Sequence, residues 1–326
     1  MAVARPPPSP PRIEVRPATR SPRLNLLRTG RRTDDQRSWW GLLYLLPALG
    51  LVLPFKFVPL VSGFVDSLWH WVDVGGAGQF VGFGNYARMV GDPEVVAAFA
   101  NIGRVVLTLP VWVVSPLLVA FLIHQRTPGW RLFRAVYFLP YMIAPVIVGS
   151  IFREILGTSG PLNILLRSVG LGWFAQAWLG GINTALLAVV GVSLWSFFGL
   201  GVITYLAGLA SLDESVLEAA ALDGAGFWRT LLSIVLPMLR PVVSYWAVLC
   251  LGGMFIWMFP LLFSLTQGGP GYATMLPEYL VYLTAFQFND RGYATAIGIV
   301  LFAVVSLASF WIVREMYASS VARERA

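Results

Sequence analysis

Long apolar runs dominate this 326-residue chain and restrict its fold more than any other feature. A helix needs about 20 consecutive apolar residues to cross the hydrocarbon core of a bilayer. Six runs approach that length, and charged residues make up only 12% of the chain, about half the share usual in soluble domains. The sequence therefore predicts an all-α membrane protein with six transmembrane helices, at residues 42–64, 105–123, 135–152, 184–207, 243–265 and 293–313.

Prolines interrupt two of these runs. Pro47, Pro54 and Pro59 lie in the first run, and Pro145 lies in the third. Neighbouring helices can provide partners for the carbonyl groups that a proline leaves free. We therefore expect these prolines to kink their helices rather than end them.

Arginine is concentrated on one side of the predicted membrane. With the N-terminus inside, the inner segments 1–38, 124–134, 208–242 and 314–326 hold 17 arginines and nine acidic residues, whereas the outer segments hold five and seven. The positive-inside rule therefore places both termini in the cytoplasm. It also accounts for the net charge of +7 without nucleic acid as a partner. Lys56, the remaining basic residue, either snorkels to the headgroups or lines a transport path.

The two ends of the chain differ from its middle. Residues 1–38 hold seven prolines and nine arginines, and such a segment buries too little apolar surface to fold. We predict a disordered cytoplasmic tail at 1–38, a transmembrane domain at 39–316 and a second cytoplasmic tail at 317–326. The single cysteine, Cys250, excludes an intrachain disulfide.

A polar unit, SLDESVLEAAALDGAGFWRTLLSIVLP at 211–237, separates the fourth and fifth runs on the predicted inner side. Ser211 followed by Glu214 is a capping box for a first helix. Gly224 can adopt the left-handed conformation that closes it, and a second helix follows, ending near Pro237. The unit is either an interfacial hairpin that only joins two helices or a rigid element through which a partner moves them.

Part of this unit, EAAALDGAGFWRTLLSIVLPMLRP, resembles the EAA loop of binding-protein-dependent ABC importer permeases. The matching positions are Glu218, Ala219, Ala220, Asp223, Gly224, Ala225, Ile234, Leu236, Pro237 and Pro241. The resemblance implies that the loop at 211–241 docks in a cleft of a cytoplasmic ATPase subunit. Glu218 would contact donors there, Ala219 and Ala220 would allow close approach, and Gly224 would provide the turn. The residues expected to couple the chain to the ATPase are Glu218, Ala219, Ala220, Asp223, Gly224 and Ala225.

Three further stretches resemble the sugar-type branch of these permeases, which handles oligosaccharides, polyols and glycerol phosphates. They are FVGFGNYARMVGDPEVVAAFANIGRVVLT, FRAVYFLPYMIAPVIVGSIFREIL and LTQGGPGYATMLPEYLVYLTAFQFNDRGYATAIGIVLF. The likeness covers residues 40 to 316, and the GGP element suggests the first permease of a pair. It implies an inner-membrane protein that works with a second homologous permease, two ABC ATPases, an extracytoplasmic solute-binding protein and membrane lipid.

No P-loop sequence occurs in the chain, so ATP and magnesium are expected on the partner ATPases, with no cofactor in this chain. His70 and His124 are isolated, so no metal site is expected, and no catalytic residues stand out. A secondary transporter would need acidic residues within its transmembrane helices, and a membrane enzyme would need a convergent site. Both remain weaker alternatives.

The fourth and fifth runs flank the polar unit and, by the resemblance, line the translocation path. Sugar sites combine aromatic surfaces with a few polar partners. The candidates are Trp195, Ser196, Phe197, Tyr205, Tyr245, Trp246, Met254, Phe255, Trp257 and Met258, although any of them could instead pack the bundle or face lipid. The segment LGGMFIWMFPLLF lacks the Asn or Asp that the family often carries there. The second permease is therefore expected to supply the polar contacts, or the substrate has an apolar portion.

Overall fold

The computed structural model describes residues 44–71, 78–125 and 130–324. It divides into two units, Met1–Val58 and Pro59–Ala326. The predicted tail at 1–38 lies outside the described residues. Residues 317–324 of the predicted C-terminal tail continue the last helix.

The first predicted transmembrane segment is one continuous helix over Tyr44–Asp66. It contains a π-helical turn, η1 (Leu53–Phe57), followed by α2 (Val58–Asp66). Pro54 lies inside the π turn and Pro59 in the first turn of α2, so these prolines do not end the helix. This agrees with the sequence expectation for the first run.

A short hairpin and three helices follow in the second unit. The strands β1 (Trp69–His70) and β2 (Gln79–Phe80) pair in antiparallel register, so the all-α prediction becomes mostly helical. The next helices are α3 (Gly84–Gly91), α4 (Pro93–Leu107) and α5 (Leu109–His124). Asp92 caps α4 by accepting a hydrogen bond from the Glu94 amide at 2.9 Å. Because of this cap, the apolar helix Pro93–His124 begins earlier than the predicted 105–123.

The third predicted transmembrane segment is broken rather than kinked. It consists of α6 (Trp130–Phe138), the 3₁₀ turn η2 (Leu139–Met142) and α7 (Pro145–Ile155). The two parts meet at 103°. Ala144 has ψ 133°, since a residue before proline is pushed out of the helical region. The expectation that Pro145 only kinks a helix is therefore wrong, because Pro145 starts a new one.

The fifth predicted segment is also broken. A long helix, α9 (Ala185–Leu209), precedes the polar unit. After it come α13 (Arg240–Ile256) and a separate short helix, α14 (Phe259–Leu265). The prediction of one helix at 243–265 is wrong because α13 ends before Pro260, which lies in the first turn of α14.

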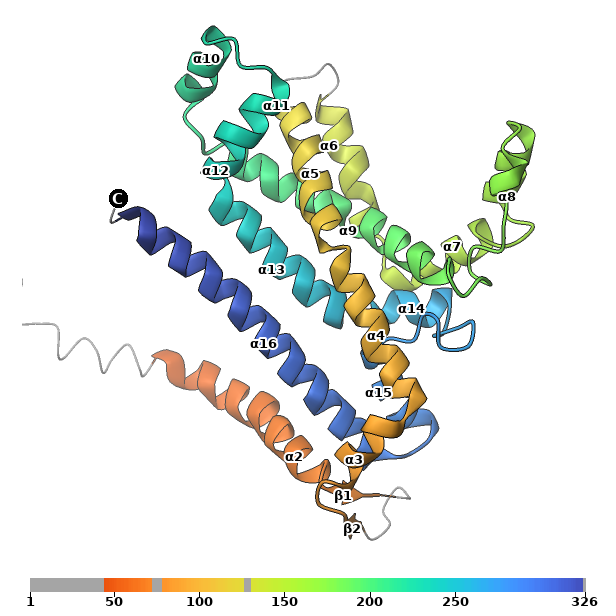
Figure 1. Cartoon of the computed structure of the whole chain (residues 1–326). Coiled ribbons are helices and arrows are strands. Elements are labelled where there is room, and N and C mark those ends of the chain that lie inside the picture. Colours follow the sequence, from red (N-terminus) through yellow and green to blue (C-terminus); the bar gives the residue numbers. More distant parts are fainter. Residues whose placement is uncertain (1–43, 72–77, 126–129, 325–326) are drawn as a thin grey trace, which may run out of the picture. The chain divides into compact units, whose positions relative to one another are not determined.

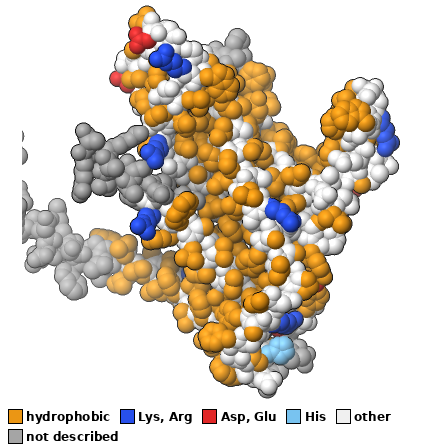
Figure 2. All heavy atoms as spheres, viewed as in Figure 1, with side chains coloured by type: hydrophobic (Ala, Val, Ile, Leu, Met, Phe, Trp, Pro, Cys, Tyr) orange, Lys and Arg blue, Asp and Glu red, His pale blue; other side chains and the backbone are white. Residues whose placement is uncertain are grey.

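The remaining elements are α8 (Pro161–Ser168), η3 (Gly172–Phe174), α15 (Pro277–Tyr282), η5 (Leu283–Gln287) and α16 (Arg291–Glu324). Four helices in the described residues are long and apolar enough to cross a membrane. Two further pairs of helices are bent, Ala135–Met142 with Pro145–Ile155 and Phe227–Met238 with Arg240–Ile256, and the number rises to six if each bent pair forms one transmembrane segment. In Figure 2, hydrophobic side chains cover most of the visible face, as lipid exposure requires.

Two glycines allow close helix packing in the core. A Cβ at Gly199 of α9 would collide with the Tyr137 carbonyl oxygen and lie 2.7 Å from the Phe138 Cα. A Cβ at Gly149 of α7 would collide with the Ser264 hydroxyl of α14. Both positions therefore require glycine, and they hold α9 against α6 and α7 against α14.

One buried amide fixes the loop before α15. Asn101 of α4 is 1% exposed. Its Nδ2 donates to the carbonyl oxygens of Tyr272 and Met275 at 2.8 and 3.0 Å, and its Oδ1 accepts from Arg104 at 2.8 Å. The loop that carries GGPG is thus attached to α4.

Candidate functional site

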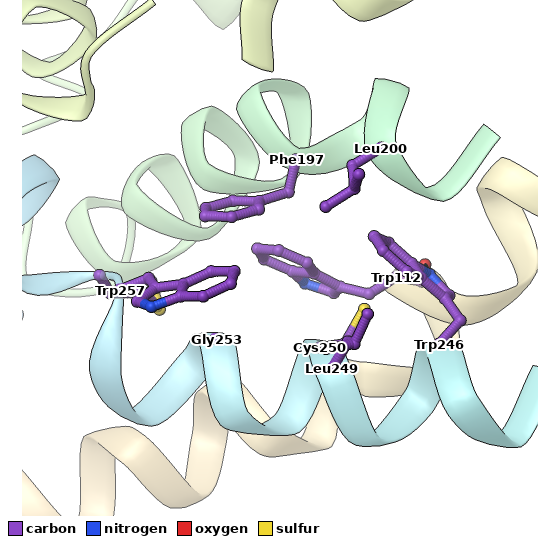
Figure 3. Close-up of a pocket in the computed structure, with 9 residues that line it drawn as sticks. Trp112, Phe197, Leu200, Trp246, Leu249, Cys250, Gly253 and Trp257 are labelled. Carbon is purple, nitrogen blue, oxygen red and sulfur yellow. Dashed lines mark hydrogen bonds between the residues drawn. The ribbon is translucent and has the colours of Figure 1, made fainter. Parts of the chain in front are cut away.

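Four aromatic rings surround a narrow slot in the second unit (Figure 3). Three of them lie on α5, α9 and α13, and the fourth, Trp257, directly follows α13. The slot volume is about 10 Å³, room for about one water molecule. The lining is almost entirely apolar and comprises Trp112, Phe197, Leu200, Trp246, Leu249, Cys250, Gly253, Trp257 and Met258. We call this the aromatic slot.

The aromatic rings of the slot contact one another in defined geometries. Trp257 stacks on Phe197, with centroids 5.7 Å apart and planes 12° from parallel. Trp112 lies 6.2 Å from Phe197. The Trp246 indole donates a buried hydrogen bond to the Trp112 carbonyl oxygen at 2.9 Å. This bond fixes one wall of the slot by joining α13 to α5.

Four of the predicted path residues meet in the slot, namely Phe197, Trp246, Trp257 and Met258. The others lie elsewhere. Trp195 packs on Phe152 at 5.1 Å, the Ser196 hydroxyl donates to the Val192 carbonyl, and Tyr245 is exposed. Met254, Phe255 and Tyr205 are buried in the core outside the slot lining.

Sequence reasoning missed five lining residues, Trp112, Leu200, Leu249, Cys250 and Gly253. The α13 members could have been found. Positions 246, 249, 250, 253 and 257 recur at helical spacing and therefore share one face. Nothing in the sequence indicates that Trp112, on a helix distant along the chain, faces them.

The polar unit forms α10 (Glu214–Leu222), then α11 (Phe227–Thr230), the π turn η4 (Leu231–Val235) and α12 (Leu236–Met238). Figure 1 shows α10 and the β1–β2 hairpin at opposite ends of the second unit. The segment from Phe227 to Met238 meets α13 at 80°. The predicted helix–turn–helix is present and joins α9 to α13.

The predicted capping box is wrong. The N-cap of α10 is Asp213, whose side chain accepts from the Ser215 amide at 3.0 Å. Hydrogen bonds from the side chain and backbone of Ser215 lower the pKa of the Asp213 carboxyl. The Ser211 hydroxyl is not available as a cap because it donates to the Gly208 carbonyl at 2.7 Å. The helix therefore starts two residues later than the capping box implies.

Gly224 has φ +72°, the left-handed conformation that the sequence predicts for this turn. Glu218, Ala219 and Asp223 are exposed, and Ala225 is half-buried. Ala220 is only 6% exposed, so its side chain packs within the chain. Leu222 and Trp228 flank the turn and are 89% and 61% exposed.

The described residues contain no group of three His, Cys, Asp or Glu side chains that could hold a metal ion. Glu278, at the start of α15, is a buried acidic residue that the sequence analysis does not single out. Both of its carboxylate oxygens are buried and have no hydrogen-bond partner. Burial raises the pKa of this carboxyl to about 8.

The chain is thus a mostly helical membrane protein with a helix–turn–helix between α9 and α13 and an internal slot. The chain belongs to the family of binding-protein-dependent transport system inner membrane components, whose model matches residues 81–316. This confirms the predicted multi-pass inner-membrane permease of an ABC importer. It also confirms a non-catalytic subunit without its own cofactor, whose ATPase is a separate subunit.

Two relatives and one solved structure illustrate the similarity. The chain is 31% identical over 274 residues to the multiple sugar-binding transport system permease protein MsmF of Streptococcus mutans serotype c, covering 83% of this chain and 93% of that one. It is 30% identical over 272 residues to the arabinooligosaccharides transport system permease protein AraP of Bacillus subtilis, covering 82% and 85%. A chain of a bacterial alginate ABC transporter, solved with an alginate pentasaccharide-bound periplasmic protein, has the same fold. Its TM-score is 0.74 at 22% identity, covering 86% of this chain and 94% of that one.

Proposed function

We propose that the chain forms half of the membrane pathway of an importer for a sugar or sugar-like solute, such as an oligosaccharide, a polyol or a glycerol phosphate derivative. The observation that carries this proposal is the aromatic slot. Trp112, Phe197 and Trp246 converge there from α5, α9 and α13, together with Trp257 from the end of α13. The substrates in the names of MsmF and AraP support the same solute class.

The slot suits the apolar faces of a sugar ring. Flat aromatic rings pack against such faces over a large area, whereas the slot lining offers almost no polar surface for hydroxyl groups. The hydroxyls therefore find their partners on the second permease. In the described conformation the slot has room for about one water molecule, so it must widen before a sugar can pass.

The polar unit is the element that widens it. The segment from α10 to α12 joins α9 to α13. Phe197 lies on α9, and Trp257 directly follows the end of α13. A displacement of α10 is transmitted to both helices, because α10 connects to α9 on one side and, through the turn at Gly224 and the segment Phe227–Met238, to α13 on the other. Glu218, Ala219 and Asp223 are exposed on this unit and form the contact with the ATPase. The closed and the open slot are then two conformations in equilibrium, and the ATPase shifts this equilibrium through the polar unit.

The complete importer consists of this chain, a second homologous permease, two cytoplasmic ATPases that bind ATP and magnesium, and an extracytoplasmic solute-binding protein. Each bent pair forms one transmembrane segment, which gives six segments and two cytoplasmic termini. The transmembrane domain covers residues 39–316, between the tails at 1–38 and 317–326.

Purification followed by reconstitution tests this function. We expect a P-loop ATPase to co-purify with the chain. Proteoliposomes that hold the complex and its binding protein should accumulate at least one member of a radiolabelled panel of oligosaccharides, polyols and glycerol 3-phosphate. Accumulation should occur only when ATP is present on the side of the membrane that the cytoplasmic face of the complex contacts. Accumulation of amino acids or peptides instead would refute the sugar class. Uptake driven by an ion gradient without any ATPase would refute the importer mechanism.

A further inference from the structure

A lateral groove runs between α16, the α15–η5 segment and the part of α2 from Pro59 onward, all within the second unit. Its volume is about 560 Å³. Leu60, Ile299 and Phe302 form apolar parts of its wall, and Asp66 and Arg291 also line it. We call it the lateral groove.

Two glycines leave the groove unfilled. Gly63 of α2 and Gly298 of α16 both line it. A Cβ built at either position would meet no atom within 4 Å. The space is therefore open along both helices, unlike the space at Gly199 or Gly149, where the neighbouring backbone or side chain fills it.

The charges of the groove lie at its outer end. Asp66 is the last residue of the first apolar helix, and Arg291 is the first residue of α16. Neither side chain has an ion pair or a side-chain hydrogen bond with any described residue. Their neighbour Asp290, by contrast, already has partners, because its carboxylate accepts a hydrogen bond from Arg88 at 2.6 Å and lies 3.6 Å from the His70 ring.

The groove is apolar along its length and carries one cation and one anion at its outer end. A phospholipid of the outer leaflet has the matching arrangement, with apolar acyl chains and a charged headgroup at the outer surface. We propose that the lateral groove binds one phospholipid whose headgroup carries both a phosphate and a primary ammonium. The phosphate pairs with Arg291, the ammonium pairs with Asp66, and an acyl chain lies along Gly63, Gly298 and Phe302.

Charge complementarity favours this occupant over a protein helix. A guanidinium makes strong, charge-assisted hydrogen bonds to phosphate, and a carboxylate does the same for an ammonium. A helix of the second permease seated here would have to bring a partner for each of Asp66 and Arg291, because covering either charge unpaired is costly. A purely anionic lipid would leave Asp66 facing a negative headgroup.

Native mass spectrometry of the purified transporter complex tests the proposal. The complex is placed in nanodiscs that contain equal amounts of phosphatidylethanolamine and phosphatidylglycerol and is then released into detergent. We expect one retained phosphatidylethanolamine per complex at this chain. Gly298→Leu should fill the groove and lower its occupancy about tenfold, the factor that corresponds to about 1.4 kcal/mol.

A matched control is Gly191→Leu on α9, an exposed helix position where a Cβ also meets nothing within 4 Å. It should leave the retained lipid unchanged. The double variant Asp66→Asn and Arg291→Gln keeps the groove open, and it should lose the preference for phosphatidylethanolamine while the complex still assembles.

Three results would overturn the proposal. One is equal retention of lipid in Gly298→Leu and the wild-type protein. Another is equal retention of phosphatidylglycerol and phosphatidylethanolamine in the wild-type protein. The third is efficient cross-linking of Gly298→Cys to the second permease, which would make this groove a protein interface.

Discussion

The indole of Trp257 and the ring of Phe197 lie almost parallel, with centroids 5.7 Å apart, although the two residues lie on opposite sides of the polar unit along the chain. Aromatic pairs of this kind contribute about 0.5–1.5 kcal/mol beyond their buried area. If the slot contacts the solute, Trp257→Ala should raise the KM for uptake about tenfold, since 1.4 kcal/mol corresponds to a factor of ten.

The control for this prediction is Trp195→Ala. Trp195 has the same side chain and lies on α9, but it packs on Phe152 outside the slot. Uptake of the radiolabelled solute in proteoliposomes measures both variants. An equal change in KM for the two variants would show that the slot does not contact the solute.

Gly224 should be sensitive to substitution for a backbone reason alone. Its φ is +72° and a Cβ there would meet no atom within 4 Å, so sterics outside the residue play no part. A valine would incur a penalty of about 1–2 kcal/mol for the left-handed conformation. We expect Gly224→Val to reduce solute-stimulated ATP hydrolysis by the complex and to weaken co-purification of the ATPase.

Gly226→Val provides the comparison, because Gly226 is two residues away, also has open space at its Cβ, and has φ −71°. That variant should keep most of the coupled ATP hydrolysis. Loss of coupling in both variants, or in neither, would contradict a specific role for the turn at Gly224.

Gly199 tests the packing of α9 against α6. Alanine at this position places a methyl group against the Tyr137 carbonyl and the Phe138 Cα, and overpacking of this kind typically costs about 1–3 kcal/mol. Gly199→Ala should therefore lower the Tm of the purified complex in a thermal unfolding assay. Gly191→Ala on the same helix should not, because its Cβ has free space. An unchanged Tm for Gly199→Ala would mean that α9 and α6 are further apart than the structure shows.

Glu278 should make stability depend on pH. Burial raises the pKa of its carboxyl to about 8, compared with about 4.3 in an unfolded chain. Between these values the folded protein binds one more proton than the unfolded chain, so the free energy of unfolding falls as pH rises. The expected loss between pH 5 and pH 7 is about 2–3 kcal/mol.

Glu278→Gln should remove most of this pH dependence, as judged by the Tm of the complex between pH 5 and pH 8. Glu154→Gln, at an exposed position, should leave it unchanged. A wild-type Tm that stays constant or rises over this range would show that the Glu278 carboxyl ionises normally in the folded protein.

The sequence predicts the helices and the turn more successfully than the breaks and the contacts between helices. Length and composition suffice for the apolar helices, and Gly224 is the residue that a left-handed turn requires. The sequence does not distinguish a kink from a break at Pro145, because proline can either kink a helix or begin one. Deciding between the two requires the backbone of Ala144, which takes an extended conformation here.

The aromatic slot shows the same limit for a site. Helical spacing places Trp246, Leu249, Cys250 and Gly253 on one face of α13, but it cannot indicate which other helix that face meets. Trp112 therefore enters the slot without any local sequence signal. Ser211 and Asp213 are both plausible N-caps by residue type, and the hydrogen bond from Ser211 to the Gly208 carbonyl decides between them.

Asn101 has a consequence for exchanging parts between relatives. The GGPG loop takes its shape from an amide on α4 that donates to Tyr272 and Met275, rather than from its own glycines alone. A chimera that receives this loop from another permease would acquire the sequence of that loop without its conformation unless the residue at position 101 is exchanged with it. The loop and α4 therefore have to be exchanged together.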